Sequence, residues 1–332
     1  MEQDKKSEKS RNAILEAALE LFSSQGYRGT SIREIAERAG VSTGNVYHHF
    51  ADKETIFQTV LGQYWKAIES PDLPFNKALA SGTFPDDLEE LAAAAKESVH
   101  VWRRHIALIY VDVVELSGNH IRKFYSEMAS RFERFIVTHG EAVSGEIRPG
   151  VPVTTAVMLA SRVFLQYYAV EILFGVPEQF GKGSDVVIRE IAEILRHGML
   201  KEPGLAAAAR ESVHVWRRHI ALIYVDVVEL SGNHIRKFYS EMASRFERFI
   251  VTHGEAVSGE IRPGVPVTTA VMLASRVFLQ YYAVEILFGV PEQFGKDSDR
   301  VIREIAEILR HGMLKEPGLA AAAPAPLARA RR

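Results

Sequence analysis

A long internal repeat constrains this chain more than any other feature of its sequence. Residues 91–204 align without a gap to residues 205–318, and the pentapeptide Leu-Ala-Ala-Ala-Ala opens each copy and then the C-terminal tail. Solenoid repeats are about 20–50 residues long and diverge between units, so a solenoid is disfavoured. The pattern indicates instead that one folded unit was duplicated by recombination between short matching stretches. Three positions differ between the copies: Lys96/Arg210, Gly183/Asp297 and Val186/Arg300.

Composition excludes several classes of protein. The chain has 332 residues, enough for two or more compact units, and it contains no cysteine, which excludes disulfides, thiolate metal sites and cysteine nucleophiles. The N-terminus is polar and no uninterrupted apolar stretch approaches a membrane span, so we expect a cytoplasmic protein with no membrane partner. The net charge of −2 provides no global argument for nucleic-acid binding. Any case for DNA therefore depends on where particular residues lie.

The repeat, the Gly and Pro residues and the composition together divide the chain into five predicted parts. In the connector, residues 63–90, Pro71, Pro74 and Pro85 predict irregular chain between helices. The tail has little to bury and is predicted to be disordered, and its arginines either contact phosphate or are simply solvated. The predicted parts are a flexible arm (1–10), a DNA-binding domain (11–62), a helical ligand-binding and dimerisation domain (63–204), its second copy (205–318) and the tail (319–332).

The first domain carries the signals of a helix-turn-helix. Apolar residues recur at helical spacing from Asn12 to Gln25, and Gly26 provides a stop. Ser31 and Glu34 form a capping-box pattern that starts a short second helix. That helix ends at Gly40, where a positive φ allows a sharp reversal before Ser42 starts a third helix as its N-cap. Two short helices joined by a tight Gly-containing turn make up a helix-turn-helix.

The third helix is the expected DNA reader. In a helix-turn-helix, the N-terminal part of the second helix of the motif lies in the major groove, where base edges are distinguishable. Asn45 has the amide geometry to pair with adenine, and Val46 and Phe50 are expected to pack on the other helices. The alternative is a surface of ordinary polar residues on a small bundle. The predicted reading surface is Thr43, Gly44, Asn45, Tyr47 and His48.

The segment from Asn12 to about Leu61, AILEAALELFSSQGYRGTSIREIAERAGVSTGNVYHHFADKETIF at its centre, resembles the DNA-binding signature of the TetR family. The resemblance implies a three-helix DNA-binding domain and a fourth helix beginning near Lys53 that leads to a sensor domain. It also implies homodimerisation and repression relieved by a small molecule. His49, beside the reader, fits either packing or a phosphate contact. The DNA contacts that the resemblance implies are Thr30, Arg33, Ser42, Thr43, Asn45, Tyr47, His48 and Lys53.

The rest of the chain is predicted to be all-α, because apolar residues recur at helical spacing and no alternating β pattern occurs. The resemblance implies that the last two helices of the sensor form a four-helix bundle with a partner, and that a cavity lies among the preceding helices. Aromatic residues at this spacing are usually plain core, and the alternative is that they form the walls of an apolar pocket. The predicted helices are 99–116, 121–138, 151–174 and 184–199, and the candidate ligand-binding residues are Trp102, His105, Tyr110, Glu115, Phe132, Arg162, Phe164 and Tyr168.

No catalytic or metal site is predicted. His100 and His105 are five residues apart, which does not place them on one helical face, and no carboxylate completes a set of ligands. Asp112 and Glu115 are three apart, but paired surface acids are common. Phosphate-binding Gly loops and nucleophile elbows are also missing from the sequence. We expect a protein that is not an enzyme and needs no cofactor.

These features predict a ligand-responsive regulator, most simply a repressor that a small apolar or aromatic ligand releases from a palindromic operator. The predicted partners are double-stranded operator DNA, a small-molecule effector and a second copy of the chain. The alternative is a ligand-binding or interaction protein whose duplicated sensor blocks normal dimerisation and weakens DNA binding. The connection Lys201–Gly204 is short and contains Pro203, so we expect the copies to pair between chains, although pairing within the chain stays open.

Overall fold

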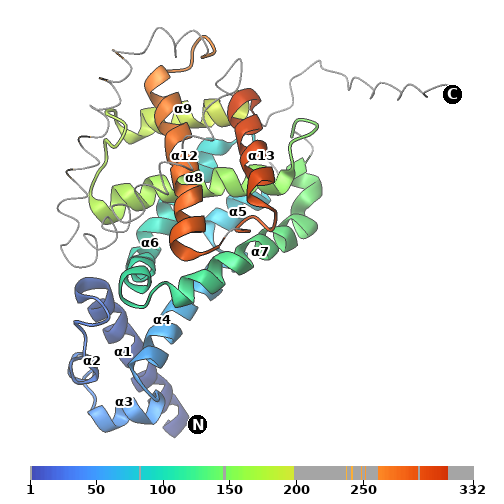
Figure 1. Cartoon of the computed structure of the whole chain (residues 1–332). Coiled ribbons are helices and arrows are strands. Elements are labelled where there is room, and N and C mark those ends of the chain that lie inside the picture. Colours follow the sequence, from blue (N-terminus) through green and yellow to red (C-terminus); the bar gives the residue numbers. More distant parts are fainter. Residues whose placement is uncertain are drawn as a thin grey trace, which may run out of the picture.

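The computed structural model describes residues 2–81, 84–144, 147–197, 261–290 and 292–312, and the single residues 237, 241, 248 and 251. Every element among these residues is a helix, which confirms the predicted all-α fold (Figure 1). The helices are α1 Glu2–Gln25, α2 Ile32–Ala39, α3 Thr43–His49, α4 Lys53–Ile68, α5 Pro74–Ala80, α6 Leu88–Glu115, α7 Asn119–Ser144, α8 Val153–Phe174, α9 Ser184–His197, α12 Val267–Phe288 and α13 Ser298–His311. The tail, residues 319–332, lies outside the described residues.

Helices α1–α4 form a small unit at one end of the molecule (Figure 1). Its core is built from apolar side chains of all four helices, including Phe22, Ile35, Val46 and Phe57, each fully buried. Helix α1 begins at Glu2, so residues 2–10 are helical where the sequence suggested a flexible arm. The physical reason is that this segment holds polar and charged helix formers and neither Gly nor Pro, so it extends the helix that the core already orders.

The caps that the sequence predicted set the geometry of the helix-turn-helix. The Ser31 hydroxyl accepts a hydrogen bond from the Glu34 amide, and the Glu34 carboxylate accepts one from the Ser31 amide at 2.8 Å. Gly40 ends α2 in the left-handed region, with φ of 67°, and the Ser42 hydroxyl then accepts from the Asn45 amide at 3.2 Å. The turn is tight because Gly40 adopts a φ that a side chain would disfavour.

The sensor is built around α6 and α8, which pack along each other. Helix α4 crosses the predicted domain boundary at residue 62 and continues to Ile68, so one helix joins the two units. The connector also contains a short helix, α5, that the sequence analysis did not predict. Pro74 occupies its first turn, where the absent N–H is no loss, and Phe75 and Leu79 are buried against the sensor core.

The second copy docks on the first within the same chain. Helices α12 and α13 pack on α8 and α9 (Figure 1). Equivalent residues of the two copies make reciprocal polar contacts, which indicates an approximate two-fold relation between them. The equivalent pairs are Thr155 with Glu304 and Thr269 with Glu190, in which the threonine hydroxyl donates, and Arg162 with Gln293 and Arg276 with Gln179, in which the guanidinium donates.

This arrangement differs from the expected pairing between chains. The expectation rested on the short connection at Lys201–Gly204. The helices that pair are not joined by that connection alone, because α9 ends at His197 and α12 begins at Val267. Residues 198–266 lie between them in the sequence.

Two helices resemble membrane spans in length and composition only: α8 and residues 267–286 of α12. In each, most of the apolar window is buried inside the protein, 67% for α8 and 61% for α12. Burial of this kind is typical of the central helices of a helical core, which are apolar on several sides.

Candidate functional site

Helix α3 presents a polar, exposed face at the free end of the α1–α4 unit. Thr43, Gly44, Tyr47 and His48 are exposed, and 56% of Tyr47 is accessible. Val46 lies on the opposite side and is fully buried. Of the other predicted contacts, Arg33 of α2 and Ser42 are also exposed, although the Ser42 hydroxyl is already used as the cap of α3.

Asn45 and His49 lie beside this face. Asn45 is half-buried, and its Oδ1 atom is enclosed without a hydrogen-bond partner, which disfavours the predicted adenine contact in this conformation. The Nε2 atom of His49 lies 3.0 Å from the Ser10 hydroxyl of α1. Burial, followed by the nearby charges of His48 and Arg11, lowers the pKa of His49. Of its two open roles, the structure favours packing.

Two predicted DNA contacts are engaged inside the domain. Thr30 is 1% exposed and its hydroxyl donates to the Gly26 carbonyl at 2.7 Å, so the prediction that its side chain contacts DNA does not hold. The Lys53 ammonium donates to the carbonyls of Tyr27 at 2.9 Å and Thr30 at 2.8 Å, and it lies 4.2 Å from the centroid of the Tyr27 ring. An ammonium has three N–H donors, so a phosphate contact through the third stays a prediction.

Partial burial lowers the pKa of Lys53, and the charges of Glu115 and Glu34 act in the opposite direction. The ammonium closes the loop between α1 and α2, because it binds the carbonyls at both ends of that loop. Lys53 therefore holds the helix-turn-helix together whether or not it also contacts DNA.

The C-terminal end of α6 joins the sensor to the α1–α4 unit. The Glu115 carboxylate accepts hydrogen bonds from the backbone amides of Tyr27, at 3.1 Å, and Arg28. Leu108 and Val111 of α6 are buried in the core of the α1–α4 unit. Glu115 is therefore not a pocket residue as the sequence suggested, because its position near the end of α6 directs it to the loop after α1.

A buried carboxylate ties three helices together at the same junction. Asp112 of α6 is fully buried, and its Oδ2 accepts from the backbone amide of Ile121 at 2.9 Å. Its Oδ1 lies 2.5 Å from His120 Nδ1, and His120 Nε2 lies 3.0 Å from Gln58 Nε2 of α4. The hydrogen bond that His120 donates to Asp112 raises the pKa of His120, burial lowers it, and the charges of Asp112 and Glu54 raise it further.

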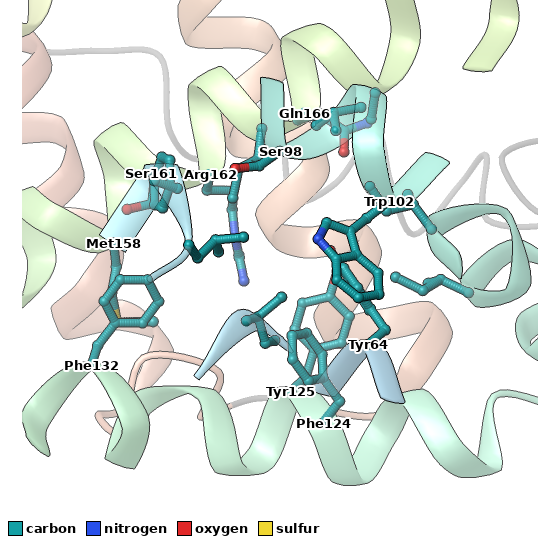
Figure 2. A pocket seen from close by; sticks show the side chains of 18 of the residues that line it. Tyr64, Ser98, Trp102, Phe124, Tyr125, Phe132, Met158, Ser161, Arg162 and Gln166 are labelled. Carbon is teal, nitrogen blue, oxygen red and sulfur yellow. The ribbon is translucent and has the colours of Figure 1, made fainter. Parts of the chain in front are cut away.

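A cavity of about 520 Å³ lies between α4, α5, α6, α7 and α8 and extends to α12 (Figure 2). Its volume is within the range of sites for small organic ligands, and most of its walls are apolar or aromatic. Four predicted ligand-binding residues line it: Trp102, Tyr110, Phe132 and Arg162.

The other candidates lie elsewhere. Phe164 and Tyr168 are buried in the sensor core outside the cavity wall. His105 lies behind the wall, with its ring 4.8 Å from that of Trp102, and burial followed by the charge of Arg104 lowers the pKa of His105 to about 4. All three belong to the plain-core alternative that the sequence analysis kept open.

The sequence analysis missed several lining residues. Tyr64 follows Val60 by four residues on the buried face of α4, so the apolar spacing continued past the predicted boundary and could have revealed it. Tyr125 lies four residues after Ile121 on the apolar side of the predicted helix 121–138, whereas Ser98 carries no comparable signal. Gln280 and Val284 of α12 also line the cavity, and no local pattern could place the second copy there.

Known proteins match the part of the chain that forms the α1–α4 unit. The family model described as bacterial regulatory proteins, tetR family, matches residues 14–60. The HTH-type transcriptional repressor KstR2 of Rhodococcus jostii is 30% identical over 123 residues, which cover 37% of this chain and 59% of that protein. The HTH-type transcriptional regulator AcrR of Shigella flexneri is 44% identical over 63 residues, which cover 19% of this chain and 27% of that protein.

Residues 14–60 of this chain are thus similar to the DNA-binding region of TetR-family transcriptional regulators. The matched residues contain α2 and α3, so the exposed face of α3 lies within the region that is similar to the tetR family model. The match spans 59% of the length of KstR2, which is less than two thirds. The activity and partners of the present protein are therefore proposed separately below.

Among solved structures, NalD of Pseudomonas aeruginosa, the secondary repressor of the MexAB-OprM multidrug efflux pump, is 24% identical. The superposition covers 50% of this chain and 85% of NalD, with a TM-score of 0.36. A score this low supports no inference about the arrangement of the sensor.

Proposed function

We propose that this chain is a cytoplasmic DNA-binding repressor of the TetR family that leaves a palindromic operator when a small apolar or aromatic ligand occupies its cavity. The observation that carries the proposal is the polar, exposed face of α3 on a helix-turn-helix whose opposite side is buried. A helix with such a face fits the major groove, where Thr43, Tyr47 and His48 would meet base edges and phosphates. The named repressors among its relatives support this reading.

The path from ligand to DNA runs along α6. Trp102 and Tyr110 of this helix line the cavity, and Glu115 at its end binds the loop that precedes α2. A ligand that shifts α6 would move the reader, because the buried contacts at the junction leave little room for independent motion. Such coupling is reciprocal, so DNA would lower affinity for the ligand by the same factor.

A second candidate function follows from the internal pairing of the copies. A helix-turn-helix regulator gains affinity by placing two readers on neighbouring half-sites. Here α12 and α13 occupy the face of α8 and α9 that a second chain would use, and each chain has one reader. Under this alternative the protein binds ligand or another partner, and it binds DNA only weakly.

Selection from a pool of random DNA duplexes tests the proposal, because it does not require the operator sequence to be chosen in advance. We expect the full chain to enrich a sequence with two-fold symmetry, and its affinity for that duplex to fall steeply with added salt as phosphate contacts release counterions. Adding aromatic compounds to the complex should then release the DNA. Recovery of no common sequence would reject the repressor assignment and favour the second candidate.

A further inference from the structure

One half-buried cation, with an enclosed nitrogen atom, lies in the wall of the cavity. Three charged residues line the cavity. Two of them, Glu69 and Arg134, form an ion pair with exposed side chains. The third is Arg162 of α8, whose guanidinium points into the space between Phe132 and Trp102 (Figure 2). The cavity thus combines aromatic walls with a single enclosed positive charge.

The hydrogen bonds of Arg162 are incomplete. Its Nη1 atom donates to the side-chain oxygen of Gln293, whereas its Nη2 atom is enclosed and has no partner. The rings of Tyr125 and Phe294 lie 5.6 Å and 4.9 Å from the guanidinium carbon. No carboxylate forms an ion pair with Arg162 within the described part of the chain.

An unpaired charge in this position is costly, because burial removes water and nothing ionic replaces it. Burial lowers the pKa of Arg162, and the charges of Tyr125 and Tyr281 act in the opposite direction. An anion inside the cavity would supply the missing acceptor. A hydrogen bond between a guanidinium and a carboxylate is among the stronger ones in proteins.

A second polar atom of the cavity wall lacks a partner. The hydroxyl of Ser98, on α6, is enclosed and makes no hydrogen bond. Arg162 and Ser98 thus supply two unused donors from two different helices. A carboxylate has two oxygen atoms, and each can accept from more than one donor.

We propose that the cavity binds a small aromatic or alicyclic carboxylic acid in its ionised form, with its carboxylate on Arg162 Nη2 and Ser98 Oγ. The hydrophobic body of the acid packs against Tyr64, Trp102 and Phe132. This inference rests on the proposed function and names the chemical class of its ligand. Because Ser98 lies on α6, the acid also contacts the helix that leads to the reader.

The second copy completes this binding site. Gln280 and Val284 of α12 form part of the cavity wall, and Gln293 holds the other nitrogen of Arg162. The equivalent residue of the second copy, Arg276, donates to Gln179 and lies 4.9 Å from the Phe180 ring, and it is not part of this cavity. Arg276 therefore makes the same interface contacts as Arg162 without reaching the ligand, which makes it a matched control.

Calorimetric titration of the full chain, without DNA, tests the assignment. The probes are naphthoic acid and cyclohexanecarboxylic acid, each compared with its neutral amide of the same shape. We expect the acid of at least one pair to bind roughly 10- to 100-fold tighter than its amide, the factor expected for hydrogen bonds to a charged group. Arg162→Gln should abolish this preference, whereas Arg276→Gln should retain it.

Equal binding of acid and amide, binding of neither acid, or an unchanged preference in Arg162→Gln would each overturn the proposal. If Arg162→Gln does not fold, as judged by its circular dichroism, Ser98→Ala serves instead and should reduce the preference. Retention of the selected duplex is measured separately. Acid binding without any DNA binding would reject the repressor function and keep the ligand assignment. DNA binding without a preference for the acid would keep the repressor function and reject the ligand assignment.

Discussion

Single residues of the DNA-binding unit divide into those that face outward and those that hold the unit together. Thr43, Tyr47 and His48 are exposed on α3, whereas Thr30 and Lys53 are committed to backbone carbonyls at the ends of the loop between α1 and α2. Substitutions in the first group should affect DNA binding alone. Substitutions in the second should affect folding as well, because buried donors and acceptors would lose their partners.

Tyr47→Ala is predicted to weaken binding to every duplex by about 1.5–3 kcal/mol, the value of a hydrogen bond to a charged phosphate. Because Tyr47 is 56% exposed, the free energy of unfolding should change by less than about 0.5 kcal/mol. Fluorescence anisotropy and urea titration measure the two quantities. Lys53→Ala is the comparison: it removes two hydrogen bonds inside the domain and should lower stability too. Wild-type DNA affinity in Tyr47→Ala would contradict the assignment of the reading face.

His120 is predicted to make stability depend on pH. Its pKa in the folded protein is raised above 6.5 by Asp112, so protonated His120 stabilises the fold below that pH. This contribution should be lost as the pH rises through the raised pKa. Urea unfolding as a function of pH, compared between the wild type and His120→Gln, isolates the effect. The exposed His48, changed to Gln, is the control. A wild-type-minus-variant difference that grows with pH would show that the sign is wrong.

Among the helices, α6 has the central position because it belongs to both units. Its middle lines the cavity with Trp102 and Tyr110, and its C-terminal part is buried in the core of the α1–α4 unit through Leu108 and Val111. Helix α4 makes a second connection between the two units, from Lys53 beside the reader to Tyr64 at the cavity. Two helices that span both units can transmit a small displacement at the cavity to the reader.

Glu115→Ala is predicted to uncouple the reader from the sensor. The variant removes the acceptor for two backbone amides and should lower stability by about 1–3 kcal/mol. Ligand affinity should be unchanged, because Glu115 lies outside the cavity, while release of DNA by ligand should be reduced. Titration of the DNA complex with ligand measures this coupling. Glu97→Ala, an exposed glutamate on the same helix, should behave as wild type. Normal release of DNA by Glu115→Ala would exclude this route of coupling.

For the whole molecule, the decisive feature is the pairing of the two copies inside one chain. Equivalent residues meet near the axis that relates the copies, and Leu159, Val163, Leu273 and Val277 line the same narrow gap there. A tethered copy is present at a high effective concentration, so it competes well with a separate chain for the same face. Under the second candidate function, the full chain is therefore a monomer with one reader, whereas repression from a palindromic operator requires two chains to assemble on the DNA.

Removing or disrupting the second copy is predicted to create two-reader dimers. A chain ending at Pro203, or the full chain carrying Leu273→Arg in α12, should free the face of α8 and α9. Light scattering should then detect dimers, and affinity for a symmetric duplex should rise roughly 100-fold or more. Leu279→Arg is the control, because Leu279 lies on the same helix and is 37% exposed. A full-length protein that is already a dimer, with both variants unchanged, would exclude internal competition.

Local signals of the sequence determined the helices and their limits. The capping box at Ser31, the turn at Gly40 and the cap at Ser42 act within a few residues, so the helix-turn-helix was predicted correctly from them. Helical spacing likewise predicted an all-α sensor. Each of these signals depends on neighbours along the chain, which the sequence contains in full.

Only the tertiary structure decided which side chains of the helix-turn-helix are exposed, which line the cavity and how the copies pair. Thr30 and Glu115 were misassigned because helical spacing indicates a face of a helix but not what lies opposite it. Two nearly identical copies carry the same local signals, so no pattern could distinguish pairing within the chain from pairing between chains. That choice depends on the fit of α12 and α13 to α8 and α9, which is a property of the folded chain.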